Sequence, residues 1–293
     1  MVEVWGNIKD DLVDFMRELK DARLEKANLK AIRRRLEHAT PLLAAYVAKQ
    51  PALTITPSLA DLYHVPELHD IFARPVDEID GDDVTEDEIV HAFRRLPQIS
   101  EQWREDKLSF LAGLLPRLTP NMRLKKGTKS DAADVSWLGL ATSFFLCTYC
   151  HKSPCSSSGR VWHASNILAH RDTPYCVDLT DNPIASIAWT AGSVPWNYNN
   201  RVVFDNQAFE AAGRIITLCG LDPQHTTVAD MDVLNKRLVC TVCTADGLKL
   251  GRLGRVVMRW RSAVSISALQ FPPSAMIKYA SGRTYCSVLE VGI

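Results

Sequence analysis

Two cysteine pairs in this chain have the spacing that metal centres and redox centres use. Cys147 and Cys150 form the first pair, Cys240 and Cys243 form the second, and each pair follows a run of residues typical of a strand. A strand that ends in such a tight pair can direct both sulfurs to one side, which supplies half of a tetrahedral zinc site. Two such half-sites complete a four-ligand centre with no open position on the metal. We therefore predict a structural zinc ion with four thiolate ligands: Cys147, Cys150, Cys240 and Cys243.

About 90 residues lie between the two pairs, far more than the roughly 15–20 of a compact zinc ribbon. The predicted site would therefore join distant parts of one domain. Two other interpretations stay open. The thiols could be reduced core residues that pack as small apolar groups, or they could form a redox pair. The redox pair is disfavoured because neither pair is expected to open a clear helix, and a helix N-terminus is what lowers a thiol pKa.

Further candidate ligands lie between the two pairs. They could form a second metal site or replace one ligand of the first, although no two of them have a spacing specific to metal binding. His170 is the strongest substitute, because it follows the apolar run 167–169. The other thiols, Cys219 and Cys286, are expected in the core. The full set of additional candidates is His151, Cys155, His163, His170 and Cys176.

The chain lacks the short motifs that identify common catalytic or nucleotide-binding sites. The patterns GxGxxG, GxxxxGK[ST], HExxH and GxSxG are all absent from the sequence. Catalytic residues are therefore unassigned, and no organic cofactor is expected. An enzyme stays open as the alternative: three protein ligands plus water would make a hydrolytic zinc, and a cysteine with a histidine could form a hydrolase pair. The residues that could build such a pocket are His151, Cys155, His163, His170, Cys176 and Asp178.

The charge balance bears on possible partners. The 34 basic side chains equal the 34 acidic ones, so the net charge is zero. This balance argues against bulk electrostatic binding of nucleic acid. The basic stretch 249–261, which contains Trp260, is the feature that keeps nucleic-acid binding as a second alternative. On a strand, however, Arg255, Arg259 and Arg261 would share one face, as in any half-buried strand.

The sequence shows no sign of export or of membrane insertion. The first residues lack the basic start and apolar core of a signal peptide. The longest apolar stretch, 137–147, has about half of the roughly 20 residues that a membrane-spanning helix needs. We expect a cytoplasmic or nuclear protein, in which thiols stay reduced and no membrane is a partner.

The first half of the chain has the spacing of amphipathic helices. We expect helices near 4–19 and 29–36, and a new helix that begins at Thr40 as N-cap with Pro41 in its first position. Ser58 and Thr85 are expected to cap two shorter helices. A further helix is expected over 100–115.

The second half alternates strand-like runs with helical ones. The fold class predicted for the whole chain is α+β, with a helical N-terminal half and a zinc-stabilised mixed α/β C-terminal half. The expected domains are 1–125 and 131–293, joined by a basic, breaker-rich linker within 116–130. Expected strands lie at 143–147, 201–204, 237–240, 255–260 and 285–291. Expected helices lie at 206–218 and 227–234 and after Arg261.

Several segments of the chain resemble a protein family. LATSFFLCTYC, CGLDPQHTTVADMDVLNKRLVCTVC and VVMRWRSAV are similar to an uncharacterised zinc-binding-type family of mushroom-forming (basidiomycete) fungi, often found downstream of an F-box. The similarity extends upstream through PSLADLYHVPEL and LPQISEQWREDK, and so covers most of the chain after about residue 40. The resemblance implies that Cys147, Cys150, Cys240 and Cys243 are family positions. No F-box pattern stands at the start of this sequence, which suggests a free-standing ligand-recognition half.

The function expected from these observations is a zinc-stabilised intracellular module that binds a protein or a small ligand. Four thiolate ligands would leave no open position on the metal, and no catalytic motif is present. The alternatives stay open: a zinc-dependent or Cys/His hydrolase-type enzyme, and then a nucleic-acid-binding protein.

Overall fold

The structure is a computed structural model that describes residues 2–77, 81–82, 84–118, 124–125, 135–152, 162–172, 184–240, 257–269 and 288–291. It divides into two compact units, each built from two stretches of chain. Unit 1 comprises Met1–Glu105 with Ala169–Tyr198, and unit 2 comprises Asp106–Leu168 with Asn199–Ile293. The predicted linker lies mostly outside the described residues, and its described parts form the short strands β1 (Arg117–Leu118) and β2 (Leu124–Lys125).

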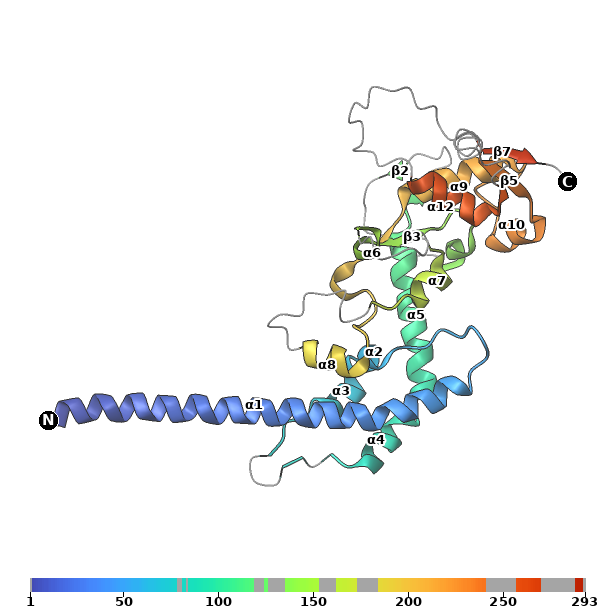
Figure 1. Ribbon diagram of the computed structural model, residues 1–293. Helices are drawn as coiled ribbons and strands as arrows, with labels where there is room; N and C mark the ends of the chain where they lie inside the picture. The colour runs from blue at the N-terminus through green and yellow to red at the C-terminus, as the bar shows by residue number, and fades with distance from the viewer. Residues whose placement is uncertain are drawn as a thin grey trace, which may run out of the picture. The chain divides into compact units, whose positions relative to one another are not determined.

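Unit 1 is helical (Figure 1). The long helix α1 packs against α2, α3, α4 and α8. Its apolar core includes Leu36, Leu62, Phe72, Phe93 and Ile187. The helices are α1 (Val2–Ala48), α2 (Leu59–Tyr63), α3 (Pro66–Phe72), α4 (Glu86–Phe93), the first part of α5 (Leu96–Leu114) and α8 (Ile184–Ala191).

The helix predicted to begin at Thr40 is instead part of α1, which runs without interruption through Pro41. The prediction was wrong because it weighed only local signals. A proline removes one backbone hydrogen bond, whereas residues on both sides of it, including Leu36, Ala39 and Leu43, belong to the same core. The hydroxyl of Thr40 donates to the carbonyl of Leu36 at 2.9 Å instead of capping a new helix.

Local capping signals elsewhere are confirmed. Ser58 and Asp61 form a capping box that opens α2, and the side chain of Thr85 accepts a hydrogen bond from the backbone N–H of Glu88 at the start of α4. In unit 2, Thr227 and Asp230 form a second capping box. These side chains satisfy N–H groups that a helix start leaves without intrahelical partners.

Unit 2 combines helices with small antiparallel sheets. β3 (Phe145–Cys147) pairs with β4 (Val202–Phe204), and a three-stranded sheet has the order β6-β5-β7. Its strands are β5 (Arg237–Cys240), β6 (Val257–Met258) and β7 (Val288–Val291). The helices are α6 (Thr148–Lys152), α7 (Ala164–Ala169), α9 (Asn206–Leu218), α10 (Val228–Leu234) and α12 (Trp260–Leu269), and the 3₁₀ turns are η1 (Val135–Gly139) and η3 (Tyr198–Asn200). The predicted α+β class, with a helical first half, is confirmed.

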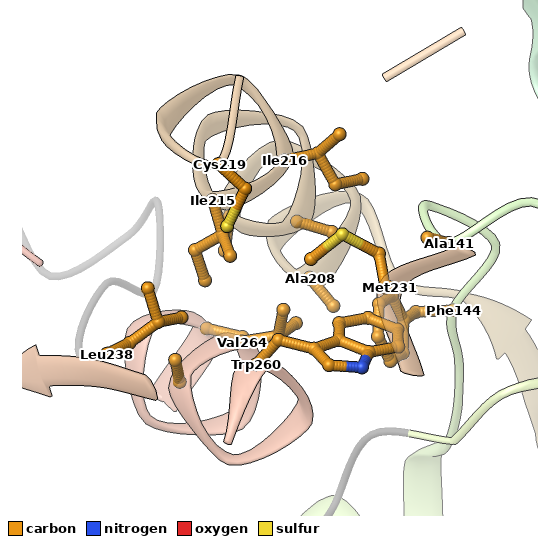
Figure 2. Packing of buried hydrophobic residues seen from close by; sticks show 14 of the residues in the cluster. Ala141, Phe144, Ala208, Ile215, Ile216, Cys219, Met231, Leu238, Trp260 and Val264 are labelled. Atoms are coloured by element: carbon orange, nitrogen blue, oxygen red, sulfur yellow. The ribbon is translucent and has the colours of Figure 1, made fainter. Parts of the chain in front are cut away.

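The core of unit 2 forms where α9 meets α12. Figure 2 shows Ile215 and Cys219 of α9 lying over Val264 and Trp260 of α12, with Met231 of α10 beside them. Cys219 is buried in this cluster, as predicted for a core thiol. α9 begins and ends where the sequence predicted, because the carboxylate of Asp205 caps its first turn and Gly220 adopts the left-handed φ of +82° after its last turn.

No helix in the described part of the chain is long and apolar enough to span a membrane.

Candidate metal centre

The first cysteine pair lies where β3 passes into α6. Backbone pairing fixes this corner: Cys147 is opposite Val202 in the β3–β4 register, and the N–H of Thr148 donates to the carbonyl of Arg201 at 2.8 Å. Cys147 is buried, with 1% of its surface exposed, and Cys150 is half-buried. The pair is therefore partly shielded from solvent and lies at the end of a strand, as the sequence pattern predicted.

One expectation about this corner was wrong. No clear helix was expected to open at either cysteine pair, but the five-residue helix α6 begins immediately after Cys147. The segment has too few residues to show an amphipathic period, so sequence spacing could not reveal it. Among the described cysteines, Cys147, Cys150 and Cys219 carry thiols and form no disulfide, which leaves both sulfurs of the pair chemically able to bind a metal.

Helix α7, which ends one residue before His170, is attached to the same strand. The backbone of Trp162 exchanges two hydrogen bonds with Phe145 of β3, at 2.7 and 2.9 Å. Next to it, Nδ1 of His163 lies 3.1 Å from the carbonyl oxygen of Ser143. Ile167 and Leu168 are buried. Ile167 and Leu168 therefore belong to a short helix whose preceding segment pairs with the cysteine strand.

The segment that follows α7 carries the second half-site. Nε2 of His170 lies 3.0 Å from Oδ1 of Asp172, and the backbone carbonyl of Asp172 accepts from Val194 N–H at 3.1 Å. Arg171, between them, donates to the carbonyl of Thr56. Its side chain is held by packing, and burial lowers the pKa of its guanidinium.

The four side chains of these half-sites can share one metal ion. One possible ligand atom from each of Cys147, Cys150, His170 and Asp172 lies within 4.8 Å of all the others. Cys147 and Asp172 are buried, while Cys150 and His170 are half-buried. Two sulfurs, one imidazole nitrogen and one carboxylate oxygen are the ligand types that zinc accepts in a tetrahedral shell. The group is compatible with a metal ion, and the two sulfurs disfavour magnesium and calcium, which bind oxygen.

The sequence identified three of these four residues. Cys147 and Cys150 were predicted ligands, and His170 was the expected substitute. Asp172 was missed, because a carboxylate two residues after a histidine has no spacing that singles it out. The only available signal was that a His-x-Asp segment follows a buried apolar run, where an ionisable group must find a partner.

The second predicted pair is not tested by the structure. Cys240 ends β5, where its backbone pairs with Val288, but its side chain lies outside the described residues, and so does Cys243. The four-cysteine shell stays a prediction. Outside the described residues also lie Cys155, Cys176, Asp178, Cys286 and the side chain of His151.

His163 belongs to the core rather than to the metal group. Its ring lies 4.0 Å from that of Phe144 and 5.4 Å from that of Trp260, measured between centroids. Burial, together with the positive charge of Arg261, lowers its pKa from 6.5 to about 4. This histidine is therefore neutral at neutral pH, and its apolar neighbours give it a packing role.

The basic stretch near Trp260 differs from its predicted form. Instead of one strand across 255–260, the described part has the two-residue strand β6 followed by α12, which begins at Trp260. The indole N–H of Trp260 donates to Asp232 at 2.9 Å, and Arg261 pairs with the same carboxylate. Trp260 is buried with an acidic partner, and so it does not present an aromatic face for stacking on bases.

Comparison with protein families, curated proteins and solved structures finds no match to this chain.

Proposed function

We propose that this protein is a zinc-stabilised binding module whose metal ion is held by Cys147, Cys150, His170 and Asp172. The observation that carries the proposal is the convergence of these four ligand types within 4.8 Å. Four protein ligands fill a tetrahedral zinc shell and leave no position for water or substrate, which is the arrangement of structural rather than catalytic zinc. Structural zinc can contribute about 10–16 kcal/mol to folding.

A groove in unit 2 has the size and lining to take a small ligand or a peptide. It has a volume of about 790 Å³ and lies along the outer face of α9 and the following turn. Phe209 and Leu218 supply apolar surface, while Glu210, Arg214 and Asp222 supply charge. Apolar walls with a few polar groups are typical of ligand sites. A metal ion that stabilises the fold would also maintain the shape of this groove. The metal group and the groove are therefore both consistent with a binding module.

The metal content of purified protein tests the proposal. We expect about one zinc ion per chain after purification without added metal, because a closed structural site stays nearly full. Cys147→Ser should lose the metal and lower the melting temperature. Cys219→Ser is the matched control, since it removes another buried thiol outside the metal group, and it should keep the zinc. Less than about half an equivalent of zinc in the unaltered protein would overturn the proposal.

Four further variants decide between the two possible ligand sets. If the shell is the one described, Asp172→Ala and His170→Ala lose zinc while Cys240→Ser and Cys243→Ser retain it. The reverse result would support the four-cysteine shell and contradict the assignment of His170 and Asp172. Metal analysis on all four variants in reducing buffer gives the answer without any assay of activity.

One observation supports a second candidate, a hydrolytic zinc enzyme. The 3.0 Å contact between His170 and Asp172 is also the geometry in which a carboxylate orients a metal-bound histidine without touching the metal. Two cysteines and one histidine would then leave a fourth position for water, which zinc activates for attack. Hydrolysis of ester or amide substrates that requires zinc would favour this candidate over the binding module.

The relation to the family of mushroom-forming fungi is also proposed. Cys147 and Cys150, which are part of the sequence segments that carry the resemblance, lie in the metal group.

A further inference from the structure

The N-terminal part of α1 carries an apolar row that is exposed along its length, although Val76, Asp77 and Gly81 line a hollow beside Leu19. Every residue from Lys9 to Arg23 is exposed. The exposed fractions of Leu12, Phe15 and Leu19 are 56%, 55% and 37%. In Figure 1 this blue end of α1 lies away from α2, α3 and α4 of the same unit. A helix without packing partners is only marginally stable in water, so this row requires a cover.

The spacing of the row indicates what covers it. Leu12, Phe15, Leu19 and Ala22 follow one another at intervals of three, four and three residues. In the sequence the same register begins at Trp5 and continues through Ile8. Alternation of three and four is the heptad pattern of a coiled coil, in which the apolar positions called a and d form the seam between helices.

The charges beside the seam indicate the identity and direction of the partner. If Leu12 and Leu19 occupy a positions, the residues before the seam (g) are all acidic: Asp11, Glu18 and Glu25. The residues after it (e) within the same segment are basic at Lys9 and Arg23, with Met16 the apolar exception. In a parallel pair each g residue faces the e residue five positions on in the partner helix, so Glu18 meets Arg23. An antiparallel pair would place acid against acid and base against base.

We propose that residues 5–25 of α1 pair with the same residues of a second copy of this chain, as a parallel two-stranded coiled coil. The same helix carries both the acidic g residues and the basic e residues. A second copy therefore provides oppositely charged neighbours without any other protein. This interface uses no residue of the metal group and does not depend on the proposed function.

Sedimentation of the full chain tests the proposal. We expect a dimer at a chain concentration of about 100 µM and dissociation on dilution. Phe15→Asp places a charge in the seam and should raise the dimer Kd by at least about tenfold. Val13→Asp is the matched control, since Val13 is 46% exposed on the same helix but outside the a and d positions, and it should leave the mass unchanged. Both sites are exposed, so at a chain concentration low enough to dissociate the dimer the thermal unfolding of each variant should match that of the unaltered chain.

A charge exchange tests the direction of the pair. Glu18→Lys alone and Arg23→Glu alone should each weaken the dimer, because each places like charges opposite one another. An equimolar mixture of the two variants should form a heterodimer, since the lysine introduced in one chain then meets the glutamate introduced in the other. A monomer at about 100 µM in the unaltered chain overturns the proposal. An equal loss in Val13→Asp and Phe15→Asp overturns the assigned seam, and failure of the mixture to restore the dimer overturns the parallel arrangement.

Discussion

Nε2 of His170 lies 3.0 Å from Oδ1 of Asp172, two positions further along the chain, and both side chains belong to the metal group. Two ligands bound to zinc at about 2.0–2.1 Å in a tetrahedral shell lie about 3.3 Å apart. A carboxylate that only orients a histidine lies at a similar distance. The contact is compatible with both roles. The loss of zinc affinity on removal of the carboxylate distinguishes them.

We expect Asp172→Ala to lower zinc affinity by more than about 100-fold. Loss of a direct ligand removes a metal bond, whereas loss of an orienting partner costs about 10–100-fold. Competition with a chelator of known affinity measures the change. Asp222→Ala is the control, because Asp222 is an exposed carboxylate outside the group, and it should leave the affinity unchanged. A loss within the smaller range would contradict the closed shell and favour the hydrolytic candidate.

His163 should make the protein less stable in acid. The unfolded chain takes up a proton near pH 6.5, but the folded protein does so only near pH 4. The unfolded state therefore binds more protons between these values, and the free energy of unfolding falls as the pH is lowered through this window, by about 3 kcal/mol in total. Among the described residues, Nε2 of His163 has no hydrogen-bond partner. A proton added there would therefore have no acceptor to stabilise it.

His163→Gln should remove this part of the pH dependence. Glutamine stays neutral and can still donate to the carbonyl of Ser143. Urea unfolding at about pH 7 and about pH 4 gives the difference in each protein, and acid release of metal contributes equally to both. If the two proteins lose the same free energy on acidification, the lowered pKa of His163 is not what destabilises the protein in acid.

The sequence predicted those elements whose signals are local. The bounds of α9 were predicted at 206 and 218, and the structure explains its start by the capping side chain of Asp205. The cysteine pair after β3 followed from a four-residue pattern. Asp172 could not be found in this way, because its role depends on residues 147 and 150 meeting it in space. The uninterrupted path of α1 through Pro41 was missed for a related reason: packing against distant residues outweighs one lost hydrogen bond.

We expect the loss of Arg35 to lower the free energy of unfolding more than the loss of most other residues of unit 1. Its side chain is fully buried, donates to the carbonyls of Ile71, Phe72 and Arg74, and pairs with Asp82 at 2.5 Å. Burial acts to raise the pKa of Asp82. Hydrogen bonding and the positive charge of Arg35 nevertheless hold this pKa below its ordinary value. Arg35→Met would leave these groups buried without their partner, and so we expect a loss of about 3–5 kcal/mol in unfolding free energy.

The neighbouring Arg34 supplies a matched control for this prediction. It pairs with the other oxygen of Asp82 at 2.7 Å, but its own side chain is 52% exposed. Because solvent screens an exposed ion pair, Arg34→Met should cost no more than about 1 kcal/mol. Denaturant unfolding of both variants measures the contrast. Equal losses would mean that the charge on Asp82, rather than the buried carbonyls, sets the cost.

Pro41→Ala should stabilise the protein. Proline in a helix interior costs about 3 kcal/mol relative to alanine, because it removes an N–H donor and crowds the preceding turn. Pro41 is exposed, so alanine leaves the core unchanged and restores the bond to the carbonyl of Glu37. We expect a gain of about 1–3 kcal/mol, measured by denaturant unfolding. The reverse change at an exposed site one turn on, Ala44→Pro, should destabilise α1 by a similar amount. A loss of stability in Pro41→Ala would show instead that the geometry proline imposes is needed to seat Leu42 and Tyr46 against the core of unit 1.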